Sequence, residues 1–185
     1  MRKLKLAMAA AGIAALTLTV AAGTLQAGAD RISFPPDFQN QKKWTLYGII
    51  DRPDLKIVRY FYVDKPSLAA AKPGKPVPYG TTLVMADKKA KLGADGQPVL
   101  DKDGRMSSEG DFTKVQLQKK GKGWGDDHPA NMKNSDWEYA SFNADGSRIT
   151  DQKYDVCFGC HMNRQKPSED FTFLFAPYLR DHKKG

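Results

Sequence analysis

Cysteine and histidine are scarce in this chain: its 185 residues include two cysteines and three histidines. Two cysteines form one disulfide at most, so a scaffold held together by several bridges is excluded. A zinc site built on both cysteines would need two further ligands, and only His128 and His182 are soft candidates outside the cysteine motif. The chemistry of this protein therefore depends on a single pair of thiols.

Long apolar runs are also missing after residue 22, and no segment has the pattern of a nucleic-acid-binding motif. The formal charge is +8, carried partly by lysine pairs that are scattered along the chain. Scattered lysines are typical of a solvated surface, although a basic face could also dock an acidic redox partner protein. We therefore expect no nucleic-acid partner and, once any leader is removed, a soluble protein.

The first 29 residues have the layout of a secretory signal peptide. Three cations, Arg2, Lys3 and Lys5, precede the apolar stretch Leu6–Ala22, and Ala27-Gly28-Ala29 offers small residues before Asp30. A membrane anchor is the alternative, because the apolar stretch approaches the length of a short span. The small-residue exit favours cleavage near Ala29 and a periplasmic location. Removal of residues 1–29 lowers the formal charge to +5 and leaves a single domain, 30–185.

The two cysteines stand in the segment Cys157-Phe158-Gly159-Cys160-His161. This spacing is the attachment pattern of c-type haem: both thiols reach the vinyl groups on one porphyrin edge, and the histidine becomes the proximal iron ligand. The alternatives are a disulfide, a thioredoxin-like redox pair and zinc. A redox pair needs a βαβ context that is missing here, and export suits haem attachment. We therefore predict one covalent haem c, held by Cys157, Cys160 and His161, with His161 as iron ligand.

The chain before this motif is strand-like. Five short runs rich in Val, Ile, Thr and aromatic residues are separated by Pro, Gly and Asp-Gly turn signals, which favours antiparallel pairing. The expected strands are Trp44–Ile50, Ile57–Val63, Thr81–Ala86, Phe112–Gln118 and Trp137–Phe142. A polar excursion or hairpin is expected over Gly93–Gly110, in which Asp101-x-Asp103-Gly104 is interpreted as turns because its glycine comes too early for an EF-hand.

Helices are expected mainly after residue 154. Ser67–Lys72 is interpreted as one or two helical turns, and Asp155–Asn163 as a helix that holds the cysteines on one face. Apolar residues at spacings of three and four predict a further helix over Asp170–His182, with a break or kink at Pro177. The predicted fold class is therefore α+β: a mainly antiparallel sheet with flanking helices and a C-terminal helical haem-attachment segment.

A strand-rich domain that ends in Cys-x-x-Cys-His resembles the cytochrome P460 family, including its β-sheet relatives called cytochrome c′-beta. The resemblance runs from about Lys42 to Tyr178. Its landmarks, in order, are Lys43-Trp44, Tyr62-Val63-Asp64, Val77-Pro78-Tyr79-Gly80-Thr81, Gly110-Asp111-Phe112, Trp137-Glu138-Tyr139, Cys157–His161 and Asp170-Phe171-Thr172-Phe173. The resemblance implies a mono-haem antiparallel sheet domain, often a homodimer, with helices beside the haem.

The catalytic members of this family oxidise hydroxylamine with a haem that is cross-linked to a lysine, helped by a nearby carboxylate. Aligned by its landmarks, this chain has Met85 at the lysine position and Gln116 at the carboxylate position, although a slip would bring in Lys88 or Lys89. A thioether cannot act as the amine nucleophile, and a neutral amide cannot act as the general base. Enzyme activity on nitrogen compounds is therefore left open and ranked last among the functions.

Two other functions remain as hypotheses. The c′-beta relatives suggest redox chemistry or binding of nitric oxide or another small gas at an apolar distal face. An electron carrier would need a sixth protein ligand; Met85 is the candidate, although packing against the ring is its better interpretation. His128 and His182 are expected at the surface. Coordination number distinguishes the gas-binding protein from the electron carrier.

Overall fold

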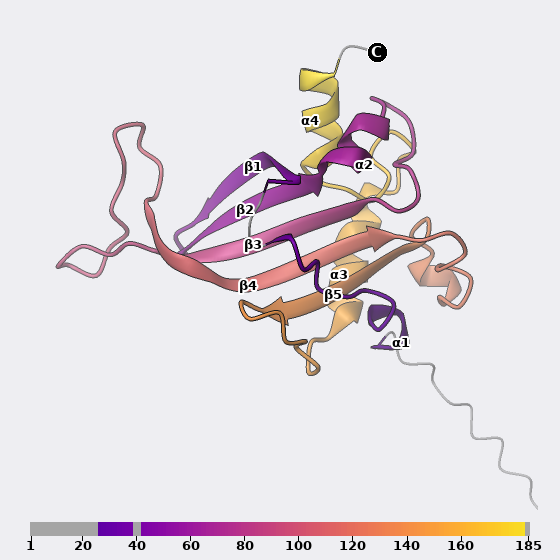
Figure 1. Cartoon of the computed structure of the whole chain (residues 1–185), viewed down its shortest axis with the longest axis horizontal. Helices are drawn as coiled ribbons and strands as arrows, with labels where there is room; N and C mark the ends of the chain where they lie inside the picture. Colours follow the sequence, from indigo (N-terminus) through magenta and orange to yellow (C-terminus); the bar gives the residue numbers. More distant parts are fainter. Residues whose placement is uncertain (1–25, 39–41, 184–185) are drawn as a thin grey trace, which may run out of the picture.

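Five antiparallel strands follow the same order in the chain and in the sheet, β1-β2-β3-β4-β5. The computed structural model describes residues 26–38 and 42–183. The strands are β1 Trp44–Arg52, β2 Ile57–Asp64, β3 Thr82–Ala90, β4 Ser108–Lys120 and β5 Trp137–Asn143. Every expected strand is confirmed, and the main difference is that β3 and β4 run several residues further than their apolar cores. The sheet therefore has the simplest antiparallel connectivity, in which each strand pairs with the next (Figure 1).

The short helix α2 (Lys65–Ala70) follows β2 directly. Asp64 caps its N-terminus, because the side-chain oxygen Oδ1 accepts a hydrogen bond from Ser67 N at 2.8 Å. The second oxygen of Asp64 accepts from Thr82 N at 3.2 Å, which ties the helix start to the first residue of β3. The prediction of one or two helical turns here is confirmed, with the start two residues earlier than Ser67.

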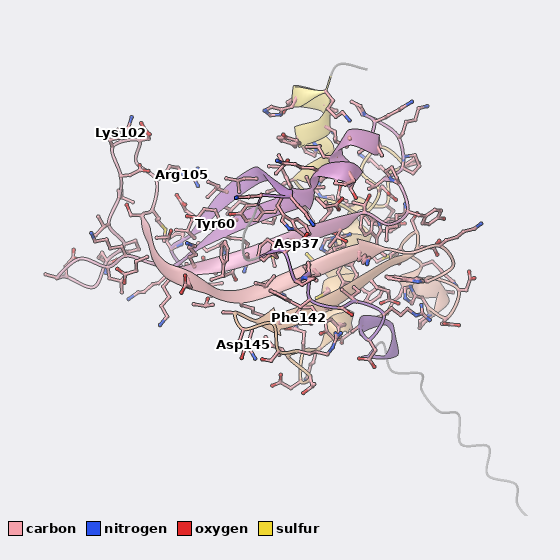
Figure 2. The ribbon with its side chains drawn as sticks, in the orientation of Figure 1. Asp37, Tyr60, Lys102, Arg105, Phe142 and Asp145 are labelled. Atoms are coloured by element: carbon pink, nitrogen blue, oxygen red, sulfur yellow. The ribbon has the colours of Figure 1, made fainter. Side chains whose placement is uncertain are left out.

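Residues 91–107 leave the sheet between β3 and β4 as a long projection, which carries Lys102 and Arg105 in Figure 2. Isolated bridges join Leu92 to Pro98 and Leu100 to Met106, and Asp101 Oδ1 accepts backbone hydrogen bonds from residues 103 and 105. The polar excursion and its turns are thus confirmed. Arg105 donates to both carboxylate oxygens of Asp51, at 2.8 and 3.0 Å, and so ties the projection back to β1.

The two faces of the sheet are covered by different parts of the chain. Because side chains alternate along a strand, one face carries Tyr60, Tyr62 and Phe142. Residues 30–38, called the N-terminal segment below, cross this face (Figures 1 and 2). The ring of Phe34 contacts that of Phe142, and the ring of Phe38 contacts that of Tyr62, each at a centroid distance of 5.5 Å. The helices α3 (Tyr154–His161) and α4 (Phe175–His182) lie on the other face. The motif Cys157–His161, on α3, therefore lies against the face of the sheet that the N-terminal segment does not cover.

The predicted helix over Asp170–His182 is wrong in its first five residues, because α4 begins only at Phe175. Asp170 and Phe171 have φ values of +43° and +58°, in the left-handed region that no right-handed helix can include. Pro177 consequently falls in the first turn of α4, where its missing N–H costs no intrahelical hydrogen bond. The expected kink at Pro177 is therefore not needed.

The helix α3 is shorter than expected and continues as a 3-10 turn, η3 (Met162–Arg164). The two remaining elements are α1 (Gln26–Ala29), which lies against β5, and the 3-10 turn η2 (Ala130–Met132). The predicted signal peptide lies outside the described residues apart from its last four, 26–29. Within the described part of the chain, no helix is both long enough and apolar enough to cross a bilayer.

Candidate haem site

A cavity of about 520 Å³ lies between the sheet and the C-terminal segment. Its volume falls in the range of about 300–1,000 Å³ that is usual for cofactor sites. Most of the lining is apolar and comes from strands β1 to β5 on one side and from α3 and residues 172–174 on the other. All five residues singled out from the sequence line it: Met85, Gln116, Cys157, Cys160 and His161.

The helix α3 places Cys157, Cys160 and His161 on one side, because residues three and four apart lie one turn apart on a helix. Phe158, which is fully buried, anchors α3 against the rings of His128 and Tyr139, at centroid distances of 4.7 and 4.9 Å. Both thiols are free in this structure. Burial raises the pKa of the Cys157 thiol to about 11, so it remains protonated at neutral pH.

His161 is oriented by a hydrogen bond from its Nδ1 to the carbonyl oxygen of Phe171, at 2.6 Å. Since a carbonyl only accepts, the proton is on Nδ1 and Nε2 keeps its lone pair for a metal. Burial lowers the pKa of this imidazole, while the Phe171 carbonyl opposes that shift in part, so the ring is neutral near pH 7. His161 thus has the tautomer in which Nε2 could hold a metal.

The turn that supplies this carbonyl holds two consecutive residues, Asp170 and Phe171, in the left-handed region. Left-handed conformations cost about 1–3 kcal/mol for residues other than glycine, and they persist only when the surroundings hold them. Asp170 Oδ2 accepts from Lys120 Nζ and from Val77 N, both at 2.7 Å, and the Asp170 carbonyl accepts from Trp137 Nε1 at 2.9 Å. The Lys120 and Asp170 side chains are only 3% and 4% exposed. A buried ion pair therefore holds the turn in place.

Part of the sheet side of the cavity is a row of directly opposed residues. Met85 lies opposite Phe61 on β2 and Gln116 on β4, and Gln116 lies opposite Ser141 on β5. Directly opposite residues of antiparallel strands point to the same face, so the four side chains are neighbours. The structure thus brings Met85 and Gln116 together and places them across the cavity from α3.

The alternative register, with Lys88 or Lys89 in place of Met85, does not occur. Lys88 Nζ lies 5.0 Å from the centroid of the Phe112 ring, on the face covered by the N-terminal segment, and Lys89 is exposed. Among the described residues that line the cavity, none is lysine, aspartate or glutamate. The nucleophile and the base that hydroxylamine oxidation would need are therefore missing from this lining.

Arg59 is a cavity residue that the sequence did not reveal. Its guanidinium donates to both oxygens of Asp87 on the neighbouring strand, at 2.7 and 2.9 Å, and the two side chains are 16% and 9% exposed. The bidentate pair leaves the cavity edge with little net charge while its donors stay fixed in place. Its position two residues before Phe61, on the same side of β2, could have indicated a place in the cavity. We did not expect one, because a single charged residue in a strand usually faces water.

His128 is buried, so its predicted surface position is wrong. Its Nε2 lies 2.8 Å from Glu138 Oε1, and both side chains are at most 5% exposed. His182 is exposed, as expected, and its ring stacks on that of Tyr178. The described residues contain no group of three or more His, Cys, Asp or Glu side chains that could hold a metal ion.

These features fit a porphyrin: the cavity has the right size, an apolar lining, two thiols on one helix face and an imidazole with Nε2 available. Iron bound in this way would supply electron transfer or the binding of a small ligand. The fold and the site define the class as a c-type cytochrome on an antiparallel sheet.

A sequence profile of the family described as Cytochrome P460 matches residues 35–174. The chain belongs to this family, and the resemblance inferred from its landmarks is confirmed. No curated protein was found to match the chain.

Proposed function

We propose that this cytochrome is an exported, periplasmic protein that binds nitric oxide or a similar small neutral gas at one covalently held haem c. Cys157 and Cys160 would form the two thioethers and His161 Nε2 would bind the iron. Residues 1–29 would be removed as a signal peptide. The motif Cys-x-x-Cys-His occurs once in the chain, which supports a single haem.

The observation that carries this proposal is the lining opposite α3. Phe61, Leu83 and Met85 present apolar or weakly polar groups there. Arg59 is the one lysine or arginine among the described residues of the lining, and Asp87 neutralises it. A ligand in such a space receives no charge stabilisation, so neutral diatomic molecules are favoured over anions. Gln116 is a polar group within this surface, and its Nε2 lies 3.5 Å from the hydroxyl of Ser141, which also lines the cavity.

The test is an optical spectrum of the purified holoprotein in the ferric and ferrous states, before and after addition of nitric oxide. We expect a high-spin ferrous spectrum that changes on adding the gas. A low-spin ferrous spectrum that is indifferent to nitric oxide would refute the proposal, because it would mean that a side chain permanently occupies the second axial position.

Electron transfer is the second candidate, and the position of Met85 favours it. This side chain lies across the cavity from α3, where a thioether could bind the iron and raise its reduction potential. In that case Met85→Ala converts a low-spin spectrum to a high-spin one and opens the site to nitric oxide. An unchanged high-spin spectrum in Met85→Ala would instead leave Met85 as packing beside the ring.

Hydroxylamine oxidation ranks third, because the described lining lacks both a lysine and a carboxylate. A strongly red-shifted ferrous Soret band would indicate a cross-linked porphyrin and would reverse this ranking.

A further inference from the structure

Two side chains of β4 converge on the turn that holds the proximal histidine. Gln118 Nε2 donates to the carbonyl oxygen of Phe171 at 3.1 Å, the same oxygen that accepts from His161 Nδ1. Two residues further along β4, Lys120 pairs with Asp170 at 2.7 Å. Both contacts are buried, and both reach residues that lie about 50 positions away in the chain.

We propose that Gln118 and the Lys120–Asp170 ion pair are positioning residues that set the strength of the bond between His161 and the iron. The inference rests on the proposed binding of haem by His161, but not on which gas or electron partner the protein uses. In this arrangement the ion pair holds residues 170 and 171 in their left-handed conformation and so aims the Phe171 carbonyl at Nδ1. Gln118 donates to the same carbonyl oxygen and so determines how strong the hydrogen bond from His161 Nδ1 to that oxygen is.

The two contacts act in opposite directions. A carbonyl that accepts strongly from Nδ1–H draws the imidazole towards imidazolate, which makes Nε2 a better electron donor and stabilises ferric over ferrous iron. The amide of Gln118 competes for the same oxygen and weakens this effect. The ion pair sustains the effect, because without it the turn can relax from its strained conformation and the carbonyl can move away from His161.

The first test replaces Gln118 with leucine, which is close in size, in the holoprotein with no gas added. We expect the iron–histidine stretching band of the ferrous protein to move to higher frequency and the midpoint potential to fall. A tenfold change in the ratio of ferric to ferrous protein at fixed potential corresponds to about 59 mV for one electron, and we expect a shift of up to that size. Thr113→Val is the matched control: it removes a side-chain donor from the same strand, where the hydroxyl of Thr113 donates to the carbonyl of Asp87 and not to that of Phe171. Its iron–histidine band should not move.

The second test replaces Asp170 with asparagine, which keeps the shape and an acceptor for Val77 N but removes the ion pair. We expect the opposite result: a lower iron–histidine frequency and a higher midpoint potential than in the wild type. General loosening of the site would move both variants in the same direction. The proposal is overturned if Gln118→Leu leaves the band and the potential unchanged, or if both variants shift alike. Neither readout uses nitric oxide, so failure here is separable from failure of the proposed gas binding.

Discussion

Breaking the buried ion pair should destabilise the fold far more than breaking an exposed one. In Lys120→Met the carboxylate of Asp170, only 4% exposed, loses its charged partner, although Val77 N still donates to it. The substitution also removes an ammonium group that lies 5.4 and 5.6 Å from the ring centroids of Tyr79 and Trp137. Leaving one partner of a buried pair uncompensated costs about 3–5 kcal/mol. For a chain of this length, each kcal/mol lowers Tm by about 2–4 °C, so the expected loss is about 6–20 °C.

The assay is guanidinium-induced unfolding of the holoprotein, followed by far-ultraviolet circular dichroism, with thermal melting as a second measurement. Arg52→Met is the matched control, because Arg52 and Asp54 form an exposed pair of the same type, with side chains 36% and 56% exposed. Water screens an exposed pair, so its loss should change the unfolding free energy much less than the loss of the buried pair. Equal unfolding free energies for the two variants would refute the reasoning that the Lys120–Asp170 pair holds the turn.

Three further predictions concern the haem side and the buried carboxyl group. Met85→Leu nearly conserves side-chain volume and should lower the unfolding free energy by less than about 1.5 kcal/mol. If the site binds gas, the spectrum of this variant with nitric oxide should match that of the wild type. Loss of a low-spin spectrum would instead identify Met85 as an iron ligand. Cys157→Ala should leave one thioether, which would appear as a longer-wavelength pyridine haemochrome band; an unchanged band would argue against attachment at Cys157. Burial raises the pKa of Glu138 above its ordinary 4.5, despite the opposing effects of His128 and Arg31. Its stabilising contribution is therefore complete below pH 4.5 and is lost as the pH rises through the folded-state pKa. Glu138→Gln should reduce this decrease in unfolding free energy with rising pH, which is measured by unfolding both proteins over a range of pH. Identical pH profiles for the variant and the wild type would contradict the prediction.

The strands were predictable from local sequence because each combines β-branched and aromatic residues with turn-forming residues at its ends. Antiparallel pairing also followed from the turn signals between the strands. The order of the strands was decided by the tertiary structure, because only β1 and β2 are joined by a short connection, residues 53–56. The family landmarks placed Met85 and Gln116 in the site. That they are directly opposed required the register, which depends on pairing across the whole sheet.

The start of α4 could not be predicted from periodicity. Phe171, Leu174 and Phe175 have helical spacing, but Asp170 and Phe171 adopt positive φ values because the sheet supplies partners for them. The buried position of His128 was equally hidden, because its partner Glu138 lies on β5 and the surrounding sequence is polar. Both errors have the same cause: a local pattern does not reveal what a side chain meets after folding.

The sequence by itself was enough to predict covalent haem attachment, since two thiols and an imidazole at a fixed spacing are a property of one short segment. Only the tertiary structure decided how the imidazole is held, because the Phe171 carbonyl, Gln118 and the Lys120–Asp170 pair come from distant parts of the chain. The spacing of residues within one segment is a local property of the sequence. The strength of a buried hydrogen bond, in contrast, depends on every group that shares its acceptor.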